Sequence, residues 1–243
     1  MSIERAQFTT EYFRGRNAEA KEFEIDETAR ELLEHFQEQY ERREQLGIGK
    51  SGEVWVGQDP FYSDKTCTKT IHDPHATVNT LRREFEIHQE AERAGIRVPP
   101  LLAYIESREG NGDFHALLAM KAIEGRTLEQ WFRDMKREGR RFEKSEIKEM
   151  RDQLKQMILQ LHEANIYHRD LHFGNVMIDN EGNFYIIDFG DAKVTLSSES
   201  DQEIYQAEMF KDGQMVTISN LRRDEYILNE ITERAYSDEL IAA

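Results

Sequence analysis

The sequence predicts an α+β fold with two lobes: an antiparallel β-sheet N-lobe that carries one helix, and a mainly α-helical C-lobe. Three observations support this prediction. The chain of 243 residues is long enough for one moderate domain or for two small lobes that share one cleft. From residue 43 to 71, short apolar runs are broken by glycines, which is typical of strands. After residue 124 the apolar residues recur at helical spacing.

The composition describes a polar protein with a strongly acidic balance. Hydrophobic residues make up 38% of the chain, charged residues make up 33%, and the net charge is −16. This charge argues against nucleic acid and membrane as partners, because phosphate groups attract basic surfaces. No apolar run approaches the ~20 residues that a membrane span needs, and the single cysteine, Cys67, cannot form an internal disulfide. We expect a cytoplasmic protein.

Four segments follow from the changes of pattern along the chain. Residues 1–40 are predicted to be an N-terminal extension, partly helical, because apolar residues within 27–40 lie at helical spacing. The other three segments are an N-lobe at 41–120, a short connection at 121–124 and a C-lobe at 125–243.

The predicted N-lobe contains strands and one helix. Two or three antiparallel strands are expected between residues 43 and 71, with a turn at 59–64. A helix follows at 77–94, and Gly95 is a suitable C-cap. The segment 101–123 reads as a hairpin whose turn is the glycine-rich stretch 109–113.

The predicted C-lobe is built from three helices and one hairpin. Thr127 and Gln130 form the pattern of a capping box that begins the first helix. The second helix, at 144–164, has a regular apolar stripe that predicts a buried face. A hairpin with its turn at 179–182 follows, and the last helix is expected at 220–236.

A glycine hairpin in the N-lobe is the first chemical signal. The stretch from Gly47 to Val54 fits the pattern G-x-G-x-x-G-x-V. A Walker A loop is excluded because Glu44 stands where that loop needs a glycine, and a dinucleotide-binding loop is disfavoured because a strand follows instead of a helix. A glycine hairpin between two strands can still approach a polyphosphate closely, since it carries no Cβ atoms there.

A lysine and a glutamate further along the N-lobe are the second signal. Lys69 lies inside the third strand, where its ammonium group could reach phosphates, and Glu84 on the following helix could orient that ammonium group. Lys65 and Glu86 are the alternatives, and the strand interior and the helix face favour Lys69 and Glu84.

The densest group of polar residues lies between two apolar runs at 166–178. The motif runs from His168 through Asp170 to Asn175, and Asp188-Phe-Gly190 follows after the predicted hairpin. Together with the glycine hairpin, the lysine and the glutamate, five motifs occur in order between residues 46 and 193. In these motifs the chain resembles the eukaryotic-type protein kinase superfamily, as a minimal or atypical member. It also resembles the RIO kinases and the minimal bacterial effector kinases of the OspG and NleH type.

The resemblance implies ATP and Mg²⁺ as cofactors and assigns residues to them. Nucleotide contacts would come from the glycine hairpin, the strand lysine and the hinge, namely Gly47, Gly49, Lys50, Ser51, Gly52, Val54, Lys69, Met120, Ala122 and Ile123. Lys69 would contact the α and β phosphates and Glu84 would orient it. Asn175 and Asp188 would bind Mg²⁺, and Asp170 would accept or orient the proton of the substrate hydroxyl.

Two further residues of the loop have roles implied by the resemblance. His168 would be a structural imidazole beneath the Asp-Phe-Gly turn. Arg169 would be able to pair with a phosphate on the segment after that turn, where the candidate hydroxyls are Thr195, Ser197, Ser198 and Ser200.

Two departures from the family pattern keep the substrate class open. His172 replaces the lysine that protein serine/threonine kinases usually carry, and this form of the loop looks like that of aminoglycoside and other small-molecule phosphotransferases. In addition, few residues follow Gly190 and no Ala-Pro-Glu motif is present. Compared with the family that the chain resembles, the C-lobe that follows the hinge at 121–124 would therefore be abbreviated.

The sequence therefore favours an ATP-dependent protein serine/threonine kinase that acts on a protein substrate or partner and can phosphorylate itself. The alternatives are a small-molecule kinase and a nucleotide-binding module that acts through a partner protein. The resemblance to effector kinases adds a host cell as a second possible location.

Overall fold

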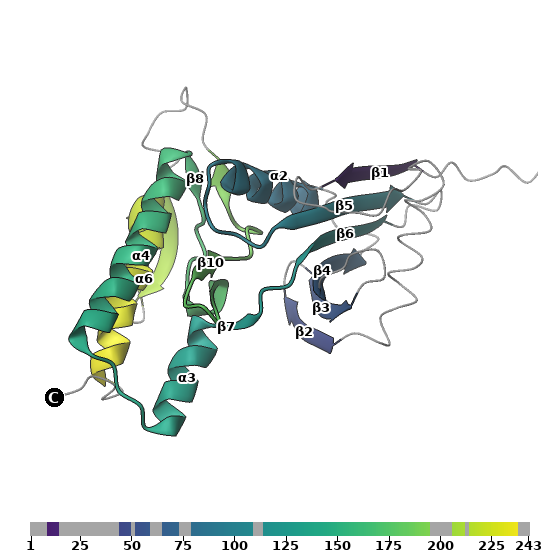
Figure 1. Cartoon of the computed structure of the whole chain (residues 1–243). Coiled ribbons are helices and arrows are strands. Elements are labelled where there is room, and N and C mark those ends of the chain that lie inside the picture. Colours follow the sequence, from purple (N-terminus) through teal and green to yellow (C-terminus); the bar gives the residue numbers. More distant parts are fainter. Residues whose placement is uncertain are drawn as a thin grey trace, which may run out of the picture. The chain divides into compact units, whose positions relative to one another are not determined.

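A computed structural model describes residues 9–14, 44–49, 52–58, 65–72, 79–108, 114–194, 206–211 and 214–237. The chain forms two compact units (Figure 1). Unit 1 consists of Met1–Gln89 and Pro99–Ala122, and unit 2 consists of Glu90–Val98 and Ile123–Ala243. Strands dominate unit 1, whereas unit 2 has long helices and small sheets, so the predicted α+β fold is confirmed.

Unit 1 is built on a six-stranded sheet in which all neighbours are antiparallel. Its strands are β1 (Thr9–Arg14), β2 (Glu44–Gly49), β3 (Gly52–Gln58), β4 (Lys65–His72), β5 (Leu101–Arg108) and β6 (Phe114–Lys121). Their order in the sheet is β1-β5-β6-β4-β3-β2. The strands predicted between residues 43 and 71 are β2, β3 and β4, and the hairpin predicted at 101–123 is β5 with β6.

Strand β1 has no counterpart in the sequence prediction. It lies inside the predicted N-terminal extension and pairs with β5, from Thr9 opposite Arg108 to Arg14 opposite Ala103. The extension therefore supplies an edge strand to the sheet of unit 1. The helix expected at 27–40 and the turns at 59–64 and 109–113 lie outside the described residues.

Helix α2 (Asn79–Arg93) covers a face of this sheet through its apolar residues. Leu81 and Phe85 join a core cluster with residues of β4, β5 and β6, and the ring of Phe85 stacks on that of Tyr104 at 5.3 Å. At the end of the helix, Gly95 adopts a left-handed conformation with φ 78°, which glycine enters without strain, so the predicted C-cap is confirmed.

The described strands of unit 2 form three small sheets. The first has the order β10 (Phe184–Ile186), β9 (Val176–Asp179), β7 (Gly125–Thr127). The second pairs β11 (Lys193–Val194) with β8 (Ile166–Tyr167), and the third pairs β12 (Gln206–Lys211) with β13 (Gln214–Ser219). The predicted hairpin with its turn at 179–182 is β9 with β10.

The helices of unit 2 are α3 (Leu128–Glu138), α4 (Lys144–Glu163) and α6 (Asn220–Ser237). Helix α3 begins with the predicted capping box, in which the Gln130 amide donates to Thr127 Oγ1 and the Thr127 amide donates to Gln130 Oε1. Helices α4 and α6 lie side by side and bury apolar faces (Figure 1). Within the described ranges, no helix combines the length and the apolar character that crossing a membrane requires.

Candidate active site

Unit 1 contains a buried ion pair between β4 and α2. Lys69 Nζ lies 2.8 Å from Glu84 Oε1 and 2.7 Å from Glu84 Oε2. The two residues are only 5% and 3% exposed, so both charges are withdrawn from water and each depends on the other. The alternatives Lys65 and Glu86 are exposed on the surface. The structure thus brings together the lysine and the glutamate that the strand interior and helix face favoured.

His88, one turn after Glu84, is a buried residue of this region that the sequence analysis did not select. Its Nε2 donates a hydrogen bond to the Pro99 carbonyl oxygen at 2.7 Å. The pKa of His88 is lowered to about 4, mainly by burial and to a smaller extent by the positive charge of Lys69, while the bond to Pro99 acts in the opposite direction. The imidazole is therefore neutral at neutral pH and supports the segment that leads into β5.

The glycine hairpin joins β2 to β3. Gly49 lies opposite Gly52, and Gly47 lies opposite Val54, with a register shift between Gln45 and Gly47. Val54 also lies opposite Lys69 in the pairing of β3 with β4. These pairings place Val54 on β3 between Gly47 of β2 and Lys69 of β4. Lys50 and Ser51 lie outside the described residues.

The predicted hinge residues follow the end of β6. Met120 is partly buried and packs against the core cluster of unit 1. The Ala122 amide donates to the Lys65 carbonyl oxygen at 2.8 Å, so that amide is already used within unit 1. Ile123 is the first residue of the second segment of unit 2 and is partly buried. Their contacts with adenine stay a prediction.

In unit 2, one buried carboxylate holds the loop that follows β8. Asp224, near the start of α6, is fully buried and accepts hydrogen bonds from the amides of His168 at 2.9 Å and Arg169 at 2.7 Å. His162 Nε2 donates to the same carboxylate at 3.1 Å. Arg169 has φ 67°, a left-handed conformation that non-glycine residues rarely adopt. The three hydrogen bonds that the buried Asp224 carboxylate accepts explain how the strained backbone conformation of Arg169 is stabilised.

The imidazole of His168 lies beneath the Asp-Phe-Gly turn, as the resemblance implied. His168 is fully buried, its Nε2 donates to the Ile187 carbonyl oxygen at 3.0 Å, and its ring packs on that of Phe189 at 5.1 Å. The histidine therefore links the loop after β8 to the turn after β10. Because the ring is fully buried, this geometry suits a structural group.

Asp170, Asn175 and Asp188 are brought together within unit 2. Asn175 Nδ2 donates to the Asp170 carbonyl oxygen at 2.9 Å and lies 3.4 Å from Asp170 Oδ2. The Ile187 amide donates to the Asn175 carbonyl oxygen at 3.0 Å, which holds the residue before Asp188 against Asn175. Asp188 has φ 62° and its Oδ1 accepts from the Gly190 amide at 3.3 Å.

These residues suit a magnesium ion by the nature of their donor atoms. Asp188 is exposed and presents a carboxylate, and the side chain of Asp170 is 43% exposed. Because Asn175 directs its amide nitrogen at Asp170, its amide oxygen is the atom that it offers to a cation. Carboxylate and amide oxygens are the ligands that Mg²⁺ prefers, and it usually keeps several waters and substrate oxygens as further ligands.

His172 forms the start of a short 3₁₀ helix, η2 (Phe173–Asn175), and faces the candidate catalytic carboxylate. Its Nδ1 accepts a hydrogen bond from the Gly174 amide at 3.0 Å, so Nε2 carries the ring proton. That Nε2 lies 3.8 Å from Asp170 Oδ2. A Cβ atom on Gly174 would lie 2.7 Å from His172 Cε1, so the glycine is needed for the ring to occupy this position.

Side chains from α3, η2 and α6 pack against one another in a cluster that supports the loop carrying Asp170 and Asn175. The rings of Phe132 and Phe173 stack at 5.0 Å, and the Arg234 guanidinium lies over both. Arg234 Nη2 also donates to Glu129 Oε1 at 2.8 Å, and this hydrogen bond lowers the pKa of Glu129. The cluster fixes Phe173, and with it the 3₁₀ helix that carries Asn175.

The sequence analysis missed Asp224, although a signal for it exists. In the predicted last helix the inward positions are Leu221, Ile227, Leu228 and Ile231, and Asp224 falls at the same helical spacing. A carboxylate on an apolar face is costly to bury unless several donors satisfy it. This position could therefore have been recognised as a buried support. The hydroxyls from Thr195 to Ser200, proposed as partners of Arg169, lie outside the described residues.

Comparison with known proteins agrees with these motifs. The family model described as protein kinase domain matches residues 40–219. A candidate cyclin-dependent kinase F-2 of Oryza sativa subsp. japonica is 29% identical over 159 residues, which are 65% of this chain and 48% of that protein. The hormonally up-regulated neu tumor-associated kinase of Homo sapiens is 30% identical over 60% of this chain and 20% of its own length. The serine/threonine-protein kinase PLK4 of Aedes aegypti is 26% identical over 63% of this chain and 19% of its own length.

The chain thus spans about half the length of the rice protein and about a fifth of the other two. The family match runs from the start of the glycine hairpin region through the loop after β8 to the end of β13, and it covers well over half of the chain. The chain belongs to the protein kinase family.

Proposed function

We propose that this chain is a protein serine/threonine kinase that transfers the γ-phosphate of ATP to protein hydroxyls, its own included, with Mg²⁺ as the metal. The proposal rests mainly on the arrangement of the loop after β8. There the Asp170 carboxylate is partly exposed, while the backbone before it is held by Asp224 and the carboxylate itself is within reach of Asn175. An accessible carboxylate on a rigid support is what positioning a substrate hydroxyl requires.

Lys69 and Glu84 supply the charge in unit 1. The Lys69 ammonium, which Glu84 holds, would bind the α and β phosphates of the nucleotide, and the backbone amides of the glycine hairpin would cover those phosphates. Met120, Ala122 and Ile123 would contact the adenine. The Ala122 amide already donates to the Lys65 carbonyl oxygen. The Ala122 carbonyl oxygen and the backbone groups of Ile123 are therefore the better candidates for hydrogen bonds to adenine.

Asn175 and Asp188 hold the metal in unit 2. The metal held there would supply positive charge that offsets the charge of the transferred phosphoryl group. Asp188 contributes its carboxylate, and Asn175 contributes its amide oxygen while its amide nitrogen keeps Asp170 in place. Asp170 then accepts a hydrogen bond from the substrate hydroxyl and receives its proton.

A small-molecule kinase is the second candidate, and His172 is the observation in its favour. The ring lies beside Asp170, and its Nε2, which carries the ring proton, is 3.8 Å from Asp170 Oδ2. A lysine there would reach the transferred phosphate on a flexible stem, whereas the imidazole is fixed by the Gly174 amide. A fixed ring narrows the space for the acceptor. The resemblance to effector kinases adds action within a host cell as a further proposal.

Labelled ATP with Mg²⁺ separates these functions. The protein is incubated with three acceptors in parallel: casein, a mixture of aminoglycosides and small hydroxyl compounds, and no acceptor. Phosphoserine or phosphothreonine in casein or in the chain itself supports the protein kinase, and label only in small molecules supports the second candidate. Tight nucleotide binding without transfer to any acceptor would instead favour a module that acts through a partner protein.

An Asp188→Ala variant is the control for the metal assignment. It should lose transfer, because the remaining oxygen ligand of Asn175 is uncharged. Self-labelling at the wild-type rate by this variant would contradict the assignment of Asp188 to the metal.

A further inference from the structure

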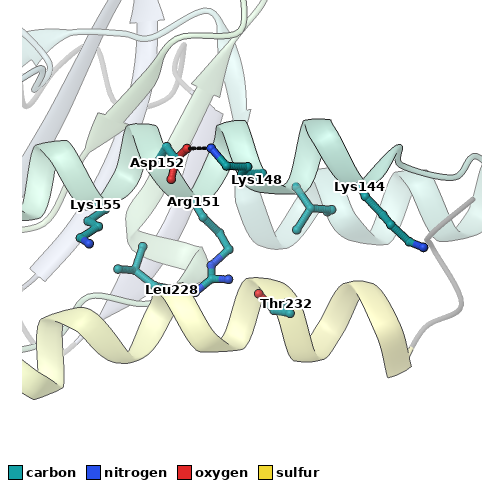
Figure 2. Close-up of a pocket in the computed structure, with 8 residues that line it drawn as sticks. Lys144, Lys148, Arg151, Asp152, Lys155, Leu228 and Thr232 are labelled. Atoms are coloured by element: carbon teal, nitrogen blue, oxygen red, sulfur yellow. Dashed lines mark hydrogen bonds and ion pairs between the residues drawn. The ribbon is translucent and has the colours of Figure 1, made fainter.

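A row of basic side chains runs along one face of α4 in unit 2. Lys144, Lys148, Arg151 and Lys155 are spaced by four, three and four residues, which places them on one side of the helix. They line a groove of about 370 Å³ together with Leu228 and Thr232 of α6 (Figure 2). The row stands out because the chain as a whole has a net charge of −16.

One of these cations is neutralised locally, and three are not. Lys148 Nζ donates to Asp152 Oδ2 at 2.6 Å, and this hydrogen bond raises the pKa of Lys148 and lowers that of Asp152. The charges of Lys155 and Arg151 also lower the pKa of Asp152. Within the ranges that the structure describes, Lys144, Arg151 and Lys155 form no ion pair of their own. The groove therefore carries a net positive charge.

Two buried polar atoms in the same groove have unused hydrogen-bonding capacity. Arg151 Nε and Thr232 Oγ1 are buried and have no hydrogen-bond partner among the described residues. Figure 2 shows Arg151 reaching from α4 toward α6, where its guanidinium lies in the space beside Leu228 and Thr232. A buried donor without an acceptor costs free energy, so the groove suits a ligand that brings acceptor oxygens.

We propose that this groove binds an acidic, extended segment of a partner protein. Carboxylates match both features, because they accept the paired N–H groups of a guanidinium and carry the opposite charge to the row. From Lys144 to Lys155 the helix rises roughly 16 Å, which an extended chain spans with about five residues. The row is thus too long for a single small anion and fits a short peptide.

The overall charge favours a peptide over larger anions. A membrane surface or a nucleic acid would also meet the acidic remainder of the molecule, whereas a short segment meets only the groove. This binding site goes beyond the proposed phosphotransfer, and its test does not depend on it. If transfer proved absent, the groove would still bind its ligand.

Fluorescence anisotropy tests the proposal on the full chain. The probe is a short fluorescein-labelled peptide of alternating Glu and Ser residues, and a peptide of alternating Gln and Ser is the neutral control. We expect the acidic peptide to bind and to weaken with added salt, since exposed charges are screened. The Lys144→Gln/Lys155→Gln variant should bind about tenfold more weakly, because rim charges steer and hold an oppositely charged ligand. Arg151→Lys should also weaken binding, since it keeps the charge but loses the paired donors.

A charge-matched control excludes a general effect of net charge. Arg133→Gln/Arg137→Gln removes two exposed cations from α3 and should leave peptide binding unchanged. Equal weakening by both double variants would overturn the proposal, as would equal binding of the acidic and neutral peptides. Binding of phosphatidylserine vesicles or a single-stranded DNA oligonucleotide in preference to the acidic peptide would overturn it as well.

Discussion

Unit 1 and unit 2 hold their candidate functional residues in place in different ways. In unit 1 the functional charges are themselves buried, since Lys69 and Glu84 hold one another inside the fold. In unit 2 the buried charge is a support, Asp224, and the candidate catalytic carboxylate Asp170 stays partly exposed. The first arrangement ties function to stability. The second separates them, because the group that holds the loop is not the group proposed to react.

This difference has a practical consequence for mutations. Truncating one partner of a buried ion pair leaves the other charge uncompensated, which is costly. Changing a partly exposed carboxylate removes little packing and few hydrogen bonds. Changes at Lys69 should therefore lower both stability and activity, whereas changes at Asp170 should lower activity alone.

The largest loss of stability is expected at Asp224. Asp224→Asn keeps the size but replaces an acceptor oxygen by a donor nitrogen that faces the amides of His168 and Arg169. We expect a loss of about 4 kcal/mol in the free energy of unfolding, measured by urea titration. Asp152→Asn, on the exposed face of α4, is the control and should leave the transition unchanged. A small loss at Asp224 would show that the loop is held by other contacts.

The next effect is expected in unit 1. Lys69→Met should lower the free energy of unfolding by about 3 kcal/mol, because Glu84 is then buried without its partner. A Lys69→Met/Glu84→Leu variant should regain most of that stability while remaining inactive, since the buried charges are removed together. Additive losses in this double-mutant cycle would contradict the coupling of the two side chains.

A smaller effect of pH is expected from His88. Its pKa in the folded protein is about 4 against 6.5 for the free side chain, so the unfolded chain binds the proton first as pH falls. This contribution leaves stability unchanged above about pH 6.5 and lowers it between there and pH 4, by about 2 kcal/mol from pH 7 to pH 5. Urea titrations at both pH values should show a smaller difference for His88→Gln. An equal difference in both proteins would assign the acid sensitivity to other groups.

The smallest change in stability is expected at Gly174. In Gly174→Ala the new Cβ meets the His172 ring, which must leave its present position beside Asp170, at a cost of about 1 kcal/mol. The rate of phosphate transfer should fall by more than the small loss of folded protein would explain. Combining Gly174→Ala with His172→Ala should relieve the clash, so the two losses of stability would not add. Additive losses would show that the ring and the glycine act independently.

Much of this site could be predicted from local sequence patterns, because each motif lies within one short element. The glycine hairpin, the strand lysine and the loop from His168 to Asn175 are of this kind. Long-range partners were not predicted. Strand β1 pairs with β5 more than eighty positions later, and nothing in the local pattern of residues 9–14 reveals that partner.

The support for the loop was missed for the same physical reason. Asp224 lies on α6, far along the chain from His168, and its role becomes visible only when the helix face is seen against the loop. The hairpin of β12 and β13 was missed despite a local signal. The dipeptide Asp212-Gly213 between two alternating runs is a strong indication of a hairpin.

The central claim is that Asp170 acts on the substrate hydroxyl while other residues hold the nucleotide and the fold. The most direct measurement compares wild type and Asp170→Asn in three respects: the rate of phosphate transfer to casein, the affinity for ATP with Mg²⁺, and the urea transition. We expect a transfer rate lower by about 10³-fold for Asp170→Asn, with nucleotide affinity and stability near those of wild type. Transfer by Asp170→Asn within a few-fold of the wild-type rate would contradict it.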